Sequence, residues 1–304
     1  TSPFTFVLEY EFNPDEYTVG VRGTVESGLE RPLLLTDLGE GLAYSEADSV
    51  GESRTMAYVT NNVQEGIQST LLGKAEPTIV EGPLLWAAFK NKFFVMALLA
   101  GESDEAATEA RYLGGVIVQP TETEGVVRVA SAQPLSNDGS FAYRLFLGPQ
   151  EYALLSSLGQ GMEEVNPYGW KFFQPILRPI VSVIMTIFVY LHTKLSVGYG
   201  WVLVIFGVMM RVVLFPLNHK AMKAQLRNMA VQPLLKEIQT KYKDQPEKLQ
   251  KEMMRLYKEH GFNPLAGCLP MLLPWPVLVA LFFVFQNTIE LRGEQFLWLP
   301  DLSD

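Results

Sequence analysis

The stretch YGWVLVIFGVMMRVVLFPL, residues Tyr199 to Leu217, is apolar almost throughout and contains a single charged residue, Arg211. These nineteen residues would extend about 28 Å as a helix, close to the roughly 30 Å hydrocarbon core of a bilayer. We therefore predict a transmembrane helix over residues 199–217. A charge at the centre of such a helix costs about 2.5–3.5 kcal/mol on insertion scales, so an intramembrane arginine points to a functional role.

The regions on the two sides of this stretch carry opposite charge. Residues 1–165 contain 9 Lys and Arg against 24 Asp and Glu, whereas residues 218–263 contain 10 basic and 5 acidic residues. The total of −9 therefore conceals an acidic region and a basic region that lies between two apolar stretches. Basic loops are typical of the cytoplasmic side of a membrane, so we expect residues 218–263 inside and the acidic region outside.

The N-terminal region has the pattern of antiparallel β-structure. Residues 5–12 alternate apolar and polar side chains from Phe6 to Phe12, and residues 17–26 alternate again after an Asn-Pro-Asp turn. Such runs indicate strands with one buried face. Further strand-like runs lie at 32–36, 84–89, 93–99, 116–118, 126–130 and 142–147. Many short strands predict an antiparallel β-sandwich over residues 1–165.

The residue types of this β-domain exclude several kinds of chemistry. The histidines are His192, His219 and His260, and the single cysteine is Cys268, so all four lie beyond the domain. Zinc sites with nitrogen or sulfur ligands and Ser-His triads are therefore excluded from it. No spacing singles out a pair of its many carboxylates for glycosidase chemistry. We predict no catalytic residue, no metal site and no cofactor.

An apolar segment, Lys171–Leu191, precedes the predicted span. Gln, Arg and two prolines fill its first half, which leaves twelve uninterrupted apolar residues, 180–191. Twelve residues are short for a crossing, and a second crossing would place the acidic and basic regions on one side. We predict that residues 166–198 form an amphipathic helix on the outer membrane surface.

The basic region follows the predicted span. Its apolar residues recur at helical spacing, Asp244-Gln245-Pro246 interrupts them, and Leu249, Met253 and Leu256 resume the pattern. We predict a cytoplasmic helical hairpin over residues 218–263. Its charge suits anionic lipid headgroups, ribosomal RNA or an acidic partner. The alternative is that the charge only fixes the topology.

A second transmembrane helix is predicted over residues 264–289, which carry no charge. Three prolines in its first half predict a bent or locally unwound helix. Gln286 and Asn287 lie near its outer end, and residues 290–304 return outside. Three residues of this external segment have the character of an interfacial anchor: Phe296, Trp298 and Leu299.

Several motifs together resemble one family. Arg211 precedes Val-Val-Leu-Phe-Pro-Leu, residues 250–258 read Gln-Lys-Glu-Met-Met-Arg-Leu-Tyr-Lys, and residues 263–270 read Asn-Pro-Leu-Ala-Gly-Cys-Leu-Pro. The pieces Phe-Leu-Gly-Pro at 146–149 and Tyr-Gly-Trp at 168–170 fit the junction after an external domain. With these motifs the chain resembles the YidC/Oxa/Alb family of membrane protein insertases, and most of all its bacterial members.

This resemblance implies a β-supersandwich domain in the periplasm, followed by helices in the bacterial inner membrane. It implies a multi-pass protein without enzyme activity, and a chain that lacks the family's N-terminal span and later spans. The implied partners are nascent membrane proteins, the lipid bilayer, the Sec translocon and the ribosome, the last through the basic hairpin. DNA is not an implied partner.

The mechanistic hypothesis centres on Arg211, about 9 Å from the inner end of its span. In a hydrated groove it would attract a polar or acidic segment of an incoming polypeptide, with Gln286 and Asn287 as further groove-lining candidates. A simpler alternative is that Arg211 extends to the cytoplasmic headgroups. Two other functions stay open: an anchored periplasmic module that binds a carbohydrate or a protein, and an anion transporter, although no internal repeat supports the latter.

Overall fold

The computed structural model describes residues 5–26, 32–101, 112–121, 126–166, 172–243, 245–259 and 274–303. The motifs predicted at 168–170 and 263–270 lie outside these ranges. The chain divides into two compact units. The β-unit consists of Thr1–Pro167, Phe285–Arg292 and Ser303–Asp304, and the helical unit consists of Tyr168–Val284 and Gly293–Leu302.

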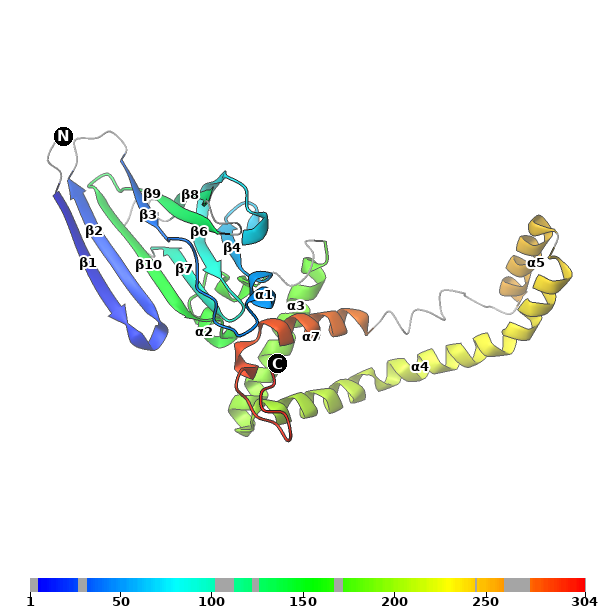
Figure 1. Ribbon diagram of the computed structural model, residues 1–304. Helices are drawn as coiled ribbons and strands as arrows, with labels where there is room; N and C mark the ends of the chain where they lie inside the picture. The colour runs from blue at the N-terminus through cyan, green and yellow to red at the C-terminus, as the bar shows by residue number, and fades with distance from the viewer. Residues whose placement is uncertain are drawn as a thin grey trace. The chain divides into compact units, whose positions relative to one another are not determined.

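Ten antiparallel strands build the β-unit and confirm the predicted antiparallel β-domain (Figure 1). Their bounds are β1 (Thr5–Asn13), β2 (Thr18–Glu26), β3 (Leu33–Asp37), β4 (Ala57–Asn62), β5 (Gly66–Leu71), β6 (Thr78–Lys90), β7 (Phe94–Ala100), β8 (Leu113–Pro120), β9 (Val127–Pro134) and β10 (Ser140–Pro149). Short helices lie between or after them: η1 (Pro14–Glu16), α1 (Ser49–Ser53), η2 (Leu72–Lys74), α2 (Tyr152–Ser157) and η4 (Met162–Glu164).

The strands are joined by hydrogen bonds into one branched sheet with the order β1-β2-β10-β7-β6-β8-β9-β3. The branch point is β6, because its first half pairs with β8 and its second half pairs with both β4 and β7. The register shifts between Glu81 and Leu84, on either side of Gly82-Pro83. Proline lacks the N–H that a sheet ladder needs, so its place at an irregularity is the expected one.

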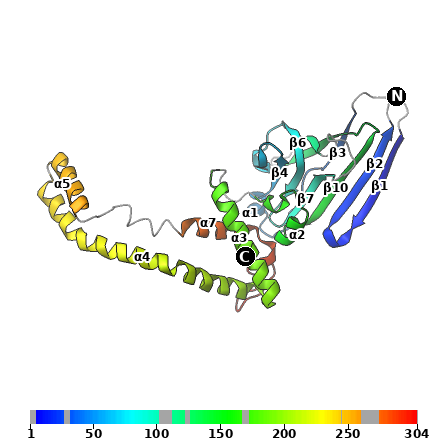
Figure 2. The same cartoon turned by 180° about the vertical axis from the view of Figure 1, so that it is seen from behind.

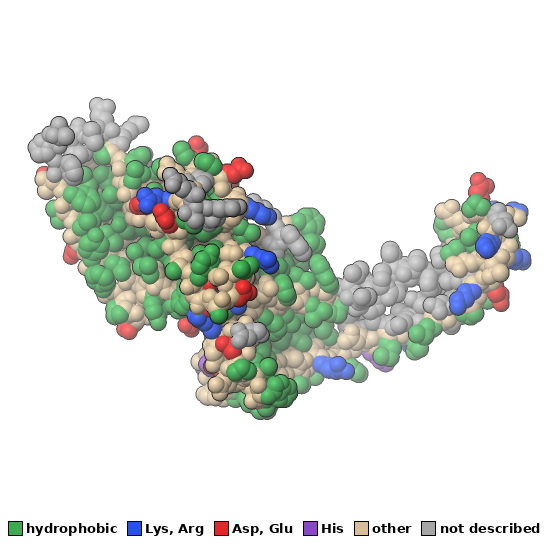
Figure 3. Space-filling model, in the orientation of Figure 1, with side chains coloured by type: hydrophobic (Ala, Val, Ile, Leu, Met, Phe, Trp, Pro, Cys, Tyr) green, Lys and Arg blue, Asp and Glu red, His purple; other side chains and the backbone are tan. Residues whose placement is uncertain are grey.

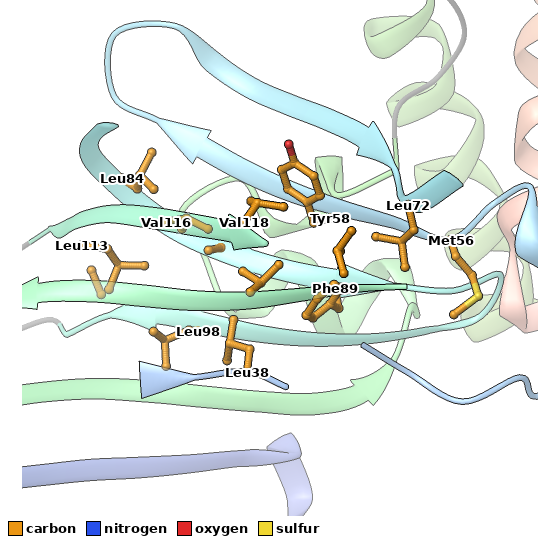
Figure 4. Close-up of a cluster of buried hydrophobic side chains, with 14 residues drawn as sticks. Leu38, Met56, Tyr58, Leu72, Leu84, Phe89, Leu98, Leu113, Val116 and Val118 are labelled. Carbon is orange, nitrogen blue, oxygen red and sulfur yellow. The ribbon is translucent and has the colours of Figure 1, made fainter. Parts of the chain in front are cut away.

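Apolar side chains fill both faces of the sheet around this branch. On one face Ala87 and Phe89 belong to a cluster with residues of β4, β7, β8 and β9 (Figure 4). On the other face Trp86 and Ala88 pack with Phe146 of β10 and with residues from α2 to η4. Because side chains alternate along a strand, β6 supplies both clusters and holds the domain together.

The first strand does not have the buried face that its alternation predicts. All nine residues of β1 are exposed, among them Phe6, Leu8, Tyr10 and Phe12. The strand lies at the end of the sheet and pairs only with β2. Alternation therefore identified a strand correctly, but no second layer of the described residues covers its apolar side.

The helical unit contains α3 (Gln174–Leu195), α4 (Tyr199–Lys241), α5 (Pro246–Glu259) and most of α7 (Trp275–Asn287), after which η6 (Ile289–Leu291) belongs to the β-unit. The turn between α3 and α4 is closed by His192, whose Nδ1 lies 2.9 Å from the Val197 carbonyl oxygen and whose ring stacks on Tyr199. Phe188 and Phe206 pack edge to face at 5.1 Å. Beyond this turn the two helices diverge (Figures 1 and 2).

The helix α3 is longer than the apolar run that predicted it. It has 22 residues, with Pro175 in its first turn and Pro179 inside. Proline is tolerated in a first turn because the N–H there has no helical partner, and one interior proline need not end a helix. By length and composition both α3 and residues Tyr199–Pro216 of α4 could cross a membrane. The short run 180–191 is therefore no argument against a crossing, and the interfacial placement stays a prediction.

The helix α4 continues without a break past the predicted boundary at residue 217. It has 43 residues, about 65 Å, and contains Pro216 and Pro233. The predicted hairpin is present further along, because α4 ends at Lys241 and α5 starts at Pro246, with Leu256 of α5 buried. Figure 3 shows Lys and Arg side chains distributed over this hairpin. Of the second predicted span the structure describes the part from residue 274, where α7 has 13 residues.

Candidate functional site

One side of the first half of α4 is open. Val202 and Phe206 are buried, whereas Val204 is exposed and Val208, Val212 and Phe215 are among the more exposed apolar side chains of the helical unit. Gly207 lies on the open side, and a Cβ atom built on it would meet no atom within 4 Å. The described residues therefore leave an apolar strip of α4 uncovered along its candidate span.

Arg211 lies in this strip, one helical turn after Gly207. Its side chain is exposed and makes no hydrogen bond or ion pair with another described residue. A guanidinium stays charged at any physiological pH and offers five N–H donors but no acceptor. The site can therefore bind carboxylates, carbonyl oxygens or phosphates, and it offers no nucleophile or general base.

The other two predicted groove residues lie at the end of α7. Gln286 is exposed and Asn287 is partly buried. Both belong to the β-unit, whereas Arg211 belongs to the helical unit. A groove shared by the three residues thus stays a prediction.

A polar cluster that the sequence did not indicate holds the segment after α7 against the β-unit. Arg292 forms an ion pair of 2.7 Å with Glu46 and donates a hydrogen bond of 3.3 Å to the Ser45 carbonyl oxygen. Its guanidinium also lies over the rings of Phe93 and Phe94, at 5.2 and 5.7 Å from their centroids. The charge of Arg292 therefore pairs with Glu46, while the planar face of its guanidinium lies over the two aromatic rings.

Glu290 makes the second contact of this segment. Its carboxylate accepts a hydrogen bond of 3.0 Å from the backbone N–H of Tyr152, the first residue of α2. Glu151 precedes that helix and provides no side-chain cap, so Glu290 supplies one from a distant part of the chain. Burial raises the pKa of Glu290, an effect that the Tyr152 hydrogen bond opposes.

Buried polar side chains of the β-unit hold the backbone at Phe93 and Phe94, whose rings contact Arg292. Asn91 accepts hydrogen bonds from the backbone N–H groups of Phe93 and Phe94 and donates to the Ala43 carbonyl oxygen. Gln150 donates to the carbonyl oxygens of Asn91 and Phe94. The backbone that carries the two rings under Arg292 is thus held by Asn91 of the β6–β7 turn and by Gln150, which follows β10.

Lys90 is the buried cation of this region. Its Nζ donates a hydrogen bond of 3.3 Å to the Thr55 carbonyl oxygen, and burial lowers its pKa from 10.5 to about 8. A buried lysine of this kind is costly to charge. No local pattern predicts the burial of this lysine, because its neighbours in the sequence do not distinguish it from the exposed lysines.

A polar hollow of about 400 Å³ lies at the other end of the β-unit, between β1, β2 and β10. Its lining includes Glu11, Glu16, Arg22, Tyr143 and Arg144. Among the residues that the structure describes, no group of three or more His, Cys, Asp or Glu is placed to hold a metal ion. The charged and hydroxyl side chains of the hollow suit a small polar ligand.

Comparisons with known proteins agree with this architecture. The profile of the family described as "YidC periplasmic domain" matches residues 2–183, and that of "60Kd inner membrane protein" matches residues 190–304. A "Membrane protein insertase YidC" of Prosthecochloris aestuarii is 33% identical over 98% of this chain and 51% of its own length. Its namesake from Chlorobaculum tepidum is 34% identical over 97% of this chain and 50% of its own length. The chain spans about half the length of the curated relatives it matches.

Proposed function

Because the chain belongs to the YidC family of inner-membrane proteins, we propose that it is part of a membrane protein insertase in the bacterial inner membrane. Its relatives carry the name membrane protein insertase. The observation that carries the proposal is Arg211, an exposed cation on the open apolar strip of α4. A surface of this kind can receive a chain that is mostly apolar and carries a few polar groups.

The proposed mechanism uses first the positive charge of Arg211 and then the apolar surface of the strip. Arg211 attracts a polar or acidic segment of an incoming polypeptide, which shortens the apolar path that this segment has to cross. The apolar part of the substrate then moves along Val204, Val208 and Val212 into lipid. Burial of its own apolar surface drives this step at roughly 25 cal/mol per Å². No covalent bond forms or breaks, so the proposed activity is not enzymatic.

The same proposal assigns a topology. The acidic β-unit lies in the periplasm, and the basic hairpin of α4 and α5 lies in the cytoplasm. The hairpin exposes seven described basic side chains, on which contacts with anionic lipid or a ribosome depend: Lys223, Lys236, Lys241, Lys243, Lys248, Lys251 and Arg255. Contact with the Sec translocon is proposed from the family resemblance alone.

Two variants of the intact protein test the role of Arg211. Insertion of a short single-span substrate with an acidic tail should fall at least tenfold with Arg211→Ala and recover largely with Arg211→Lys, if charge is what matters. Lys194→Ala removes an exposed cation from the neighbouring helix α3, to which no role in insertion is assigned, and is the matched control. Insertion that is unchanged in Arg211→Ala would remove the groove cation from the mechanism.

The hollow between β1, β2 and β10 favours a second function, a periplasmic module that binds a small polar ligand. The two functions are separable by deletion of residues 1–160. Insertion that persists in the deleted protein supports the first proposal, and loss of all activity in a correctly inserted protein supports the second.

A further inference from the structure

The external segment after η6 folds back on itself in a narrow turn. Phe296 and Leu299 exchange two backbone hydrogen bonds, of 3.0 and 2.9 Å, so that Leu297 and Trp298 form its tip. Leu297 has a φ of 55°, a left-handed conformation that leucine rarely adopts. Asn, Asp or Gly would fit this position with less strain.

The base of the turn is packed against the start of α4. The ring of Phe296 lies edge to face with Trp201 at 5.5 Å between centroids. A Cβ atom on Gly200 would lie 2.2 Å from the Phe296 ring, so a glycine is what permits this approach. The backbone N–H of Leu302 closes the segment by donating to the Glu294 carbonyl oxygen at 3.1 Å. The position of the turn along α4 is therefore fixed.

The tip of the turn points away from the described residues. Trp298 is 83% exposed and Leu297 is 71% exposed, and no charged residue lies between Glu294 and Asp301. Figure 3 shows hydrophobic side chains gathered at this end of the helical unit. Whereas Phe296 packs on α4, the two apolar side chains at the tip, Leu297 and Trp298, add little to the packing of the unit. The tip is instead suited to an apolar surrounding.

We propose that Leu297 and Trp298 enter the lipid of the outer leaflet and anchor the outer end of α4. Three observations favour lipid as the occupant. The turn lies at the first turn of a helix that is long and apolar enough to cross a membrane. Trp201, which also is exposed, lies beside it, and tryptophans are enriched at membrane interfaces. Unlike the basic hairpin, the tip also lacks charges that would favour a polar partner.

This anchor has a consequence for Arg211. Arg211 follows Gly200 by eleven positions, which corresponds to roughly 16 Å along the helix. A turn fixed in the outer leaflet would thus hold the cation near the middle of the hydrocarbon core, whose half-thickness is about 15 Å. This consequence depends on the proposed insertase function, whereas the lipid contact depends only on α4 crossing the membrane.

A fluorescent label tests the lipid contact directly. Cys268→Ser gives a cysteine-free chain, in which Leu297→Cys is labelled with the polarity-sensitive NBD group and the intact protein is reconstituted into phosphatidylcholine vesicles. Val63→Cys, at an exposed apolar position of the β4–β5 turn, is the matched control. We expect blue-shifted emission at position 297 that spin-labelled lipids quench at least threefold more strongly than at position 63.

Two other results would overturn the proposal. An NBD emission at position 297 like that of the label in water, quenched by aqueous iodide as strongly as at position 63, would place the turn in solution. Blue-shifted emission that lipid spin labels do not quench would show that protein covers it.

A double variant removes the apolar tip while the backbone of the turn is retained. Leu297→Asn keeps a residue that tolerates the left-handed backbone, and combined with Trp298→Ser it removes the apolar tip. In this double variant an NBD label on Val204→Cys, an exposed position of α4, should lie at a different depth in the bilayer, as measured by quenching with lipids spin-labelled at different depths. An unchanged profile would contradict the anchor. Because neither readout involves insertion, its outcome is distinct from the test of Arg211.

Discussion

Glu46 and Arg292 are joined by an ion pair of 2.7 Å, although 246 positions of the chain separate them. Glu46 precedes α1 in the β-domain, and Arg292 follows α7 and η6. The pair therefore ties the chain that leaves the second predicted span to the β-domain. The ion pair, the Ser45 carbonyl oxygen and the two phenylalanine rings form one contact that a single substitution can remove.

Arg292→Gln should loosen this contact. It removes the ion pair, the cation over Phe93 and Phe94, and the hydrogen bond to Ser45. For a partly buried, hydrogen-bonded charge the expected loss is about 1–3 kcal/mol in the local opening free energy. Hydrogen exchange of peptides that cover residues 285–292 and 90–94 measures this loss in detergent-solubilised protein.

The matched control is Arg22→Gln. Arg22 and Glu11 form a pair of 3.8 Å whose side chains are 71% and 73% exposed, and such pairs contribute little. Equal protection in the wild type and Arg292→Gln would show that the contact does not hold the segment.

Glu290 gives the same contact a dependence on pH. Burial raises its pKa above the ordinary value of 4.5, so the docked segment binds a proton more readily than the released one. The stabilisation from this proton is complete below the ordinary value and is lost as the pH rises through the raised pKa. Protection of residues 285–292, corrected for intrinsic exchange, should be greater at pH 5 than at pH 7.5.

Glu290→Gln should flatten this dependence, because the amide oxygen still accepts from Tyr152 without a charge to bury. Glu294→Gln, in the same part of the chain, is the control. A pH profile that persists in Glu290→Gln would assign the titration to another group.

The lowered pKa of Lys90 should make the β-unit more stable at alkaline pH. Its pKa is about 8 when folded and near 10.5 when exposed, so the unfolded state binds more protons between these values. Stability therefore rises with pH from about 8 to 10.5, by an amount on the order of 3 kcal/mol. Hydrogen exchange of β4 and β6 peptides across this range measures the rise.

Lys90→Met keeps the aliphatic chain and removes the charge. It should increase the stability of β4 and β6 at pH 7 and abolish their alkaline rise. Lys74→Met, at an exposed position, should leave the rise intact. An undiminished rise in Lys90→Met would contradict the assignment.

Local patterns predicted elements well where one face of an element is apolar. The alternation in residues 5–12 gave β1, and the helical spacing of Leu249, Met253 and Leu256 gave α5. The strand β4 was missed because all six of its residues are buried, so Ala-Tyr-Val-Thr-Asn-Asn shows no alternation. A strand whose environment is buried on both faces carries no period-2 signal.

The candidate site likewise contains one residue that a local pattern revealed and contacts that no local pattern reveals. Arg211 could be found from the sequence because a single charge in an apolar span is conspicuous. The contact of Glu290 and Arg292 with Glu46 and Tyr152 could not be found, because it joins positions more than 130 residues apart. Phe296 was predicted as part of an anchor, but it packs on Gly200, and its neighbour Leu297 takes the exposed place.

Gly200→Ala tests the fixation of the external turn to α4. Alanine favours a helix over glycine by about 1 kcal/mol, yet its Cβ would lie within 2.7 Å of three atoms of Phe296. The ring must therefore move away, and residues 293–302 should exchange their amide hydrogens at least tenfold faster. Gly207→Ala is the matched control, since its Cβ meets nothing within 4 Å.

Phe296→Ala in the Gly200→Ala background should remove the clash, so the two substitutions are expected to be non-additive. If Gly200→Ala and Gly207→Ala protected residues 293–302 equally well, the close approach of Phe296 to α4 would not be what holds the turn. Additive effects of Gly200→Ala and Phe296→Ala would lead to the same conclusion, because residues in direct contact are the ones whose free energies of substitution are coupled.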